Sequence, residues 1–214
     1  MLRDPKDLAF AVTALLGATV LADALALHAG SELWTAVTDS PSGDVSPRDL
    51  ARALVVGTAL LQGLLLVATG TVFVIWFHRL RLNAEVWAGD VHSRTPGWAI
   101  GGWFIPVAGL WIPCAIATEI WRASRPDPSA PDRRGEFLLL RGWWLVFVAD
   151  LVLARVAAWR LGRAETFEAY ASAARWLLAS DALDMAAAVL AILFVRRLTS
   201  MQHAKATGMI SAAQ

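Results

Sequence analysis

Six polar side chains within the apolar stretches of this sequence are the residues best suited to carry chemistry. They are four aspartates, one arginine and one glutamine: Asp23, Gln62, Asp150, Arg155, Asp181 and Asp184. An ionisable side chain inside a membrane span costs about 2.5–3.5 kcal/mol on insertion scales, so each one is a candidate functional residue. Asp181 and Asp184 are three residues apart, which places both carboxylates on one face of a helix.

The chemistry that this set could support is the binding of a proton or a cation. One arginine cannot neutralise four acids, so at least one aspartate should be protonated or should bind a cation. We therefore predict a buried polar cluster in which Arg155 pairs with Asp23, Asp181 or Asp184. The alternative is a structural salt bridge that locks the helix packing.

Motifs for nucleophilic or metal chemistry are absent. Gly-x-Ser-x-Gly, the glycine-rich phosphate loop and His-Glu-x-x-His do not occur. No two of the four histidines have the i, i+4 spacing of a metal-binding helix, and Cys114 is the only cysteine. The sequence therefore predicts no catalytic residue, no metal ligand and no cofactor, and it leans against an enzyme.

The composition is that of a membrane protein. Of the 214 residues, 57% are hydrophobic and 17% are charged, whereas soluble domains have about 45–50% and about 25%. The apolar residues form runs of about 20, long enough to cross a bilayer core of about 30 Å. This distribution excludes a soluble enzyme, a disulfide-stapled secreted scaffold and a disordered tail. The formal net charge of +1 gives no indication of nucleic-acid binding.

The elements that must position the polar residues are predicted to be helices. We expect an all-α, polytopic membrane bundle, one domain over residues 1–214, with four transmembrane helices at 8–29, 51–78, 138–160 and 176–196. A fifth apolar segment, 96–121, contains three prolines, four glycines and four tryptophans. Since these residues interrupt helices, we predict a re-entrant or interfacial helical hairpin there. A proline-kinked full span is the alternative.

The distribution of lysine and arginine supports four crossings. With four crossings and a cytoplasmic N-terminus, 13 of these residues lie inside and 5 outside; with five crossings, 8 lie inside and 10 outside. Cytoplasmic loops are enriched in both residue types. We therefore place both termini and the loop 122–137 in the cytoplasm of a plasma-membrane protein. A cleaved signal peptide is the rival interpretation of the first run, but the acids Asp4 and Asp7 in its leader favour an uncleaved helix.

Residues 72–124 resemble an uncharacterised actinobacterial integral membrane family, the domain of unknown function 4328. The resemblance is dense over VFVIWFHRLRLNAEVWAG and SRTPGWAIGGWFIPVAGLWIPCAIATEIWRAS, and it extends by hydropathy alone to about residue 198. The shared residues are Trp76, Arg79, Asn83, Pro96, Gly97, Trp98, Gly102, Trp103, Phe104, Pro106, Pro113, Glu119, Trp121, Arg122 and Ser124. The resemblance implies an integral membrane protein and no particular activity.

Three functional hypotheses follow. The first is a non-enzymatic membrane scaffold or signalling accessory. The second is a small transporter or an ion- or proton-coupled protein that uses an outward-facing Asp/Arg cluster. The third is an intramembrane lipid-modifying enzyme with Asp150 or Asp184 as a base. The expected partners are membrane lipids, a second copy of the chain or a membrane partner protein, and each basic residue near an anionic lipid surface contributes about 1 kcal/mol.

Overall fold

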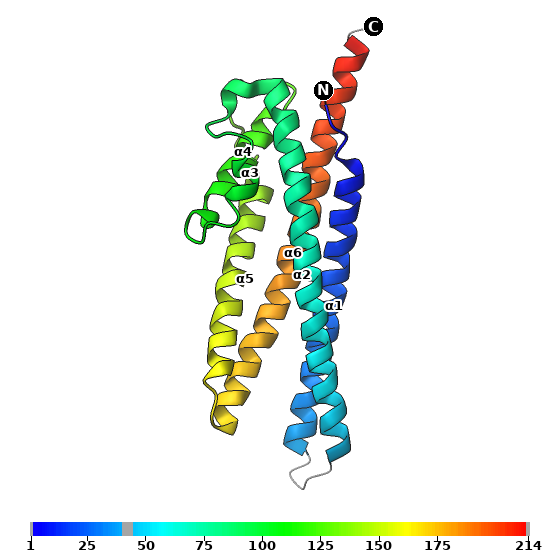
Figure 1. The fold of residues 1–214 in the computed structure, drawn as a ribbon, viewed down its shortest axis with the longest axis vertical. Coiled ribbons are helices and arrows are strands. Elements are labelled where there is room, and N and C mark those ends of the chain that lie inside the picture. Colours follow the sequence, from blue (N-terminus) through cyan, green and yellow to red (C-terminus); the bar gives the residue numbers. More distant parts are fainter. Residues whose placement is uncertain (1, 40–44, 213–214) are drawn as a thin grey trace. The chain divides into compact units, whose positions relative to one another are not determined.

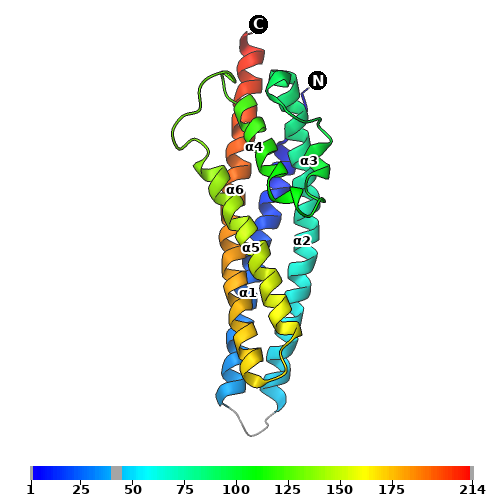
Figure 2. The same cartoon turned by 90° about the vertical axis from the view of Figure 1, so that its left-hand side faces the viewer.

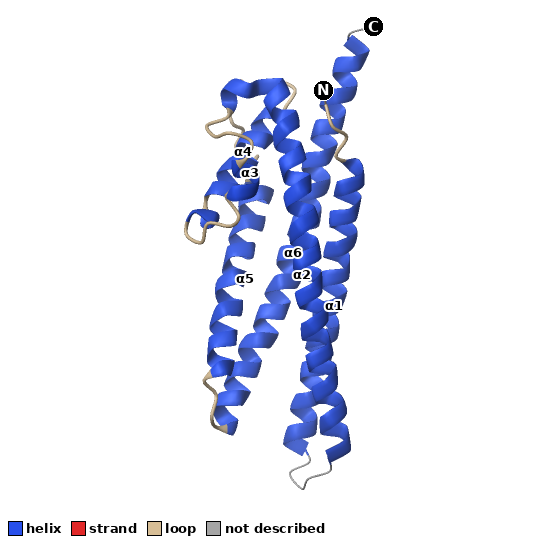
Figure 3. Ribbon diagram, in the orientation of Figure 1, coloured by secondary structure: helices blue, strands red, loops and turns tan. Residues whose placement is uncertain are grey.

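The computed structural model describes residues 2–39 and 45–212, which form helices and turns without any strand (Figures 1 and 3). The prediction of an all-helical fold is confirmed. Four helices are long and four are short. In chain order they are α1 (Lys6–Asp39), α2 (Val45–Ala88), η1 (Gly89–Val91), α3 (Trp98–Gly101), η2 (Ala108–Leu110), α4 (Ile112–Ala123), α5 (Leu138–Gly162) and α6 (Phe167–Ala212).

The long helices extend beyond the apolar runs from which they were predicted. α2 continues through the polar segment after residue 78, and α6 continues through the polar tail after residue 196. In both helices the buried face persists at a spacing of four residues, with Leu80 and Ala84 on α2 and Leu198 and Gln202 on α6. This spacing keeps one helix face toward the interior, so packing sustains the helix after the hydrophobic run has ended.

Three helices within the described residues are long and apolar enough to cross a membrane. They are Lys6–Glu32 of α1, Ala53–Val91 in the α2 region and Glu168–Gly208 of α6. α5 is not among them, and it carries Asp150 and Arg155 in the middle of its apolar run. By length and composition, the chain therefore has the helices of a membrane protein.

The chain divides into two compact units. Unit 1 comprises Met1–Leu15, Thr69–Trp144 and Leu190–Gln214; unit 2 comprises Leu16–Ala68 and Leu145–Val189. Each long helix contributes one segment to unit 1 and one to unit 2. All the short elements belong to unit 1; Figure 2 labels two of them, α3 and α4.

An aromatic cluster forms the core of unit 1. The rings of Trp143 and Phe194 stack with centroids 4.6 Å apart, and Trp76 meets Phe194 edge-on at 6.0 Å. Trp103 packs edge-on against Phe73 at 5.5 Å. Such aromatic pairs contribute about 0.5–1.5 kcal/mol each beyond the area they bury. The cluster therefore fastens residues 96–121 to the unit 1 segments of α2, α5 and α6.

Residues 96–121 form a broken, compact turn. The longest helix there, α4, has 12 residues, which corresponds to about 18 Å at 1.5 Å per residue, short of a bilayer core. Pro113 lies at the start of α4, where the missing N–H of proline is not needed by the helix. A Cβ at Gly102 would lie 2.8 Å from Ile112 Cγ2, so glycine permits the close approach of α3 and α4.

The outer side of this turn is apolar and exposed. Phe104 is 74% exposed and Val107 66%, and the ring of Trp111 is also exposed. Trp121, by contrast, is buried, and Trp103 belongs to the aromatic core. Exposed apolar side chains gathered in one short segment are typical of a region that contacts lipid or another protein.

Candidate functional site

Side chains from four helices bring most of the predicted polar cluster together in unit 2. The Gln62 amide on α2 donates one hydrogen bond to Asp23 Oδ1 on α1 (2.9 Å) and a second to Asp181 Oδ1 on α6 (3.0 Å). Ser180 Oγ on α6 donates to Asp150 Oδ1 on α5 (3.3 Å). These hydrogen bonds therefore join residues separated by up to 158 positions of sequence.

Asp23 is the most deeply placed of the four acids. Its side chain is 0% exposed, and its Oδ2 atom has no hydrogen-bond partner. A buried polar atom without a partner loses its hydration without replacement, which costs about 1–3 kcal/mol. This atom is therefore the position in the cluster that most needs a further proton or ligand.

The four carboxylates lie within electrostatic reach of one another. Asp184 interacts with Asp23, Asp150 and Asp181, and Asp23 also interacts with Asp150 and Asp181. Among the residues whose side chains the structure describes, no cation forms an ion pair with any of the four. The cluster is therefore acidic without an internal counter-charge.

Arg155 does not belong to this cluster. Its side chain is exposed and forms no ion pair with a described acid, so the predicted pairing with Asp23, Asp181 or Asp184 is absent. Arg155 follows Asp150 by five residues, which turns it about 140° around α5. One helix cannot direct both side chains to the same face at that spacing.

Several of the family-pattern residues form a buried polar network in unit 1. The Asn83 amide donates to Arg3 O (2.8 Å) and to Gln202 Oε1 (3.1 Å), and Asn83 Oδ1 accepts from the backbone N–H of Arg3 (2.9 Å). Gln202 Nε2 donates to Leu80 O (3.1 Å) and Ser124 Oγ (3.3 Å). This network links the N-terminal residues, α2, α4 and α6.

Other family-pattern residues fix the packing of the same unit. Trp76 Nε1 donates to Thr199 Oγ1 (3.1 Å), and Glu119 Oε1 accepts from Ser93 Oγ (2.6 Å). Arg79 donates to Asp4 O (2.8 Å). These contacts give the residues a structural role in unit 1, separate from the acidic cluster of unit 2.

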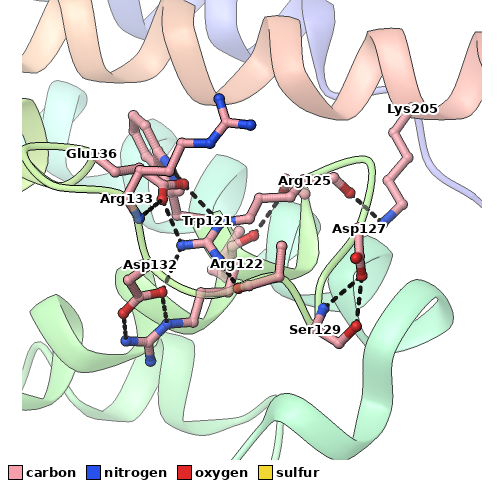
Figure 4. A network of polar contacts seen from close by, with 12 residues as sticks. Trp121, Arg122, Arg125, Asp127, Ser129, Asp132, Arg133, Glu136 and Lys205 are labelled. Carbon is pink, nitrogen blue, oxygen red and sulfur yellow. Dashed lines mark hydrogen bonds and ion pairs between the residues drawn. The ribbon is translucent and has the colours of Figure 1, made fainter.

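The loop between α4 and α5 is closed by one buried arginine (Figure 4). Arg125 donates to both carboxylate oxygens of Glu136 (2.7 and 2.8 Å), to Asp132 Oδ1 (2.7 Å) and to Ala130 O (2.8 Å). Arg122 forms a second, two-pronged pair with Asp132 (3.1 and 2.6 Å). Bidentate arginine–carboxylate pairs are the strongest and most directional of such contacts. These ion pairs give the loop a defined conformation, so its charged residues do more than set the membrane topology.

The electrostatics of the loop favour ionised acids. Hydrogen bonds from Arg122 and then Arg125 hold the pKa of Asp132 well below its usual range. Burial raises the pKa of Glu136, but the Arg133 N–H and the Arg125 guanidinium outweigh that effect and lower it. Lys205 of α6 caps the end of α4 by donating to Ala123 O (2.8 Å) and Arg125 O (2.7 Å), as cations do at helix C-termini.

Sequence reasoning missed Asp132, Glu136, Gln202 and Lys205 as members of these networks. Gln202 carried one usable signal, because it continues the four-residue spacing of the buried face of α6. The loop acids carried none, since their partners are fixed by how the loop folds. Within the described part of the chain, no three His, Cys, Asp or Glu side chains converge closely enough to hold a metal ion.

The fold and the site define the class as an all-helical protein with helices suited to membrane crossing and a polar cluster between them. The chain belongs to the family described as Domain of unknown function (DUF4328), whose model matches residues 39–200. The family resemblance predicted from residues 72–124 is confirmed. No curated protein and no solved structure matches the chain.

Proposed function

We propose that this chain is a multi-pass membrane protein that binds and releases a proton at the acidic cluster of Asp23, Asp150, Asp181 and Asp184. It belongs to the proton- or ion-coupled class of membrane proteins. The observation that carries the proposal is the environment of Asp23, which is fully buried with one carboxylate oxygen unpartnered. The exposure of Arg155 supports it further, because the competing structural salt bridge needs Arg155 inside the cluster.

The charge balance explains why a proton is the favoured ligand. Four like charges at close quarters in a medium of low dielectric constant repel one another strongly. A proton on one carboxyl removes a charge and creates an O–H donor for a neighbouring carboxylate. Among the described side chains, the one that donates to two of the acids is the neutral amide of Gln62, which satisfies hydrogen bonds without cancelling charge.

Proton release would act on the packing of unit 2. The acids sit on α1, α5 and α6, so each added negative charge pushes these helices apart, while protonation lets them close. A charge change at a packed helix interface is a common basis of a switch. The cluster would thereby couple a proton to the helix arrangement.

The membrane arrangement proposed with this function has four spans, at α1, α2, α5 and α6, with residues 96–121 entering the bilayer and returning. The short, broken helices of that segment support re-entry, as does its exposed apolar surface. Both termini and the loop 122–137 then face the cytoplasm of a plasma-membrane protein, in agreement with the lysine and arginine distribution.

The test is difference infrared spectroscopy of the purified full chain in lipid, following the C=O stretch of protonated carboxyl groups across a pH titration. We expect a pH-dependent band in the wild type. Asp23→Asn removes one carboxyl group and one like charge, so the band at neutral pH should weaken. Asp127→Asn, which changes an exposed acid of the α4–α5 loop, is the matched control and should leave the band unchanged.

Asp184→Asn provides a second variant should Asp23→Asn impair folding, because no described residue forms a hydrogen bond with its side chain. Equal bands in the wild type and in both cluster variants would overturn the proposal and favour a non-enzymatic scaffold. Proteoliposomes loaded with a pH-sensitive dye then separate transport from binding. Flux that depends on Asp23 supports a proton-coupled transporter.

A further inference from the structure

A cavity of about 1210 Å³ lies in unit 1, between the α4–α5 loop and the last turns of α6. Its walls combine positive charge with apolar surface. Four arginines and Lys205 supply the charge, and two leucines and a methionine supply aliphatic surface: Arg125, Arg133, Arg134, Arg197, Lys205, Leu138, Leu139 and Met201. This composition differs from that of the acidic cluster, so the cavity needs a separate explanation.

Some of the charged side chains that line the cavity have described hydrogen-bond or ion-pair partners, and others form no ion pair with a described residue. Glu136, which also lines it, is already bound to Arg125, and Asp127 accepts from the backbone N–H and hydroxyl of Ser129 (Figure 4). By contrast, the side chains of Arg133, Arg134 and Arg197 are exposed and enter no ion pair with a described residue. Three guanidinium groups are therefore available to an anion that enters the cavity.

The apolar wall indicates what kind of anion this is. Leu138 is 75% exposed and Met201 and Leu139 are half-buried, so the lining offers aliphatic surface as well as charge. Ligand pockets for drug-sized molecules measure about 300–1,000 Å³, and this cavity exceeds that range. An inorganic phosphate would fill a small part of it and leave the leucines uncovered.

We infer that this cavity binds the phosphate headgroup of an anionic membrane phospholipid, with Arg133, Arg134 and Arg197 on the phosphate and the start of an acyl chain against Leu138, Leu139 and Met201. Arginine suits this role because its planar fork matches phosphate oxygens bidentately. Leucine and methionine offer an acyl chain the apolar contact that a soluble phosphate would not use. The inference is independent of proton binding at the acidic cluster.

The experiment is native mass spectrometry of the full-length protein in detergent, titrated with phosphatidylglycerol, phosphatidylcholine or inorganic phosphate. We expect phosphatidylglycerol to bind more tightly than phosphatidylcholine, and inorganic phosphate at equal concentration to compete weakly. Arg197→Gln should weaken phosphatidylglycerol binding about fivefold, the equivalent of about 1 kcal/mol per basic residue at a lipid surface. The double change Arg133→Gln with Arg134→Gln should weaken it further.

Arg196→Gln is the matched control, because Arg196 is an exposed neighbour on α6 that does not line the cavity. It should leave the affinity within twofold. Equal loss in Arg196→Gln and Arg197→Gln would show general charge attraction and overturn the site. Equal binding of the two lipids would overturn headgroup selection, and full competition by inorganic phosphate would overturn a lipid as the ligand. All the variants change exposed side chains, and circular dichroism checks that each one folds.

Discussion

At the scale of single residues, Arg125 organises more of unit 1 than any neighbouring charge. It is 7% exposed, and its guanidinium group contacts Ala130, Asp132 and Glu136. A buried arginine is tolerated when several acceptors satisfy its donors, since an unpaired one would carry a large desolvation cost. The loop and its arginine therefore depend on each other.

Glu136→Gln tests this dependence. The change leaves Arg125 without its bidentate carboxylate, so we expect the free energy of unfolding to fall by about 1–3 kcal/mol at pH 7. The pKa of Glu136 is lowered in the folded chain, so its stabilising effect is present above its ordinary pKa of about 4.5 and is lost as the pH falls through the lowered value. The wild type should lose stability on acidification more steeply than the variant.

The measurement is chemical unfolding in detergent, followed by circular dichroism at a series of pH values between 7 and 3. Glu165→Gln is the control, because it changes an exposed acid that has no ion pair with a described residue. Identical acid profiles for the wild type and Glu136→Gln would show that the Arg125–Glu136 pair adds nothing to stability.

At the scale of elements, the turn of residues 96–121 owes its compactness to one close contact. A Cβ at Gly102 would lie 2.8 Å from both Ile112 Cγ2 and Trp98 O, whereas a Cβ at the neighbouring Gly101 would meet nothing within 4 Å. Both residues are helical or next to a helix, so backbone conformation does not distinguish them. Alanine substitutions at Gly101 and Gly102 therefore differ in packing and not in backbone conformation.

Gly102→Ala should therefore destabilise the protein by about 1–3 kcal/mol, the usual cost of overpacking a core. Gly101→Ala should be neutral or slightly stabilising, since alanine restricts the unfolded chain. Thermal unfolding of both variants in the same detergent makes the comparison. If the two variants unfold at the same temperature, the α3–α4 contact does not limit stability.

At the scale of the whole molecule, the four-span topology makes opposite predictions for two loops. In a Cys114→Ala background, Glu165→Cys should face the exterior and Ser129→Cys the cytoplasm. A membrane-impermeant maleimide added to intact cells should therefore label the first variant and not the second, and permeabilisation should expose both. Labelling of Ser129→Cys in intact cells would contradict four spans with a re-entrant segment.

Helical structure and the cluster acids could be predicted because both follow from local rules. Runs of apolar residues fix helices, and the cost of burying Asp23, Asp150, Asp181 and Asp184 identifies them as functional candidates. The structure joins two of these acids, Asp23 and Asp181, through Gln62.

Features that depend on side-chain direction or on distant partners could not be predicted. Arg155 was predicted to pair with Asp23, Asp181 or Asp184, although its position around α5 turns it away. The pairing of Arg125 with Asp132 and Glu136 depends on the path of a proline-rich loop, for which no periodicity exists. α2 and α6 also extend beyond their apolar runs, because Leu80 and Leu198 remain buried there.

The two N–H groups of the Gln62 amide oppose the sliding of α1, α2 and α6 along one another. Packed apolar side chains resist the sliding of one helix along another only weakly, since each of them packs almost equally well against the next apolar neighbour. Gln62 ties α2 to Asp23 of α1 and to Asp181 of α6 at one height. A slip of either partner by one turn, about 5.4 Å, would break that tie, so this amide helps to set the register of three helices within unit 2.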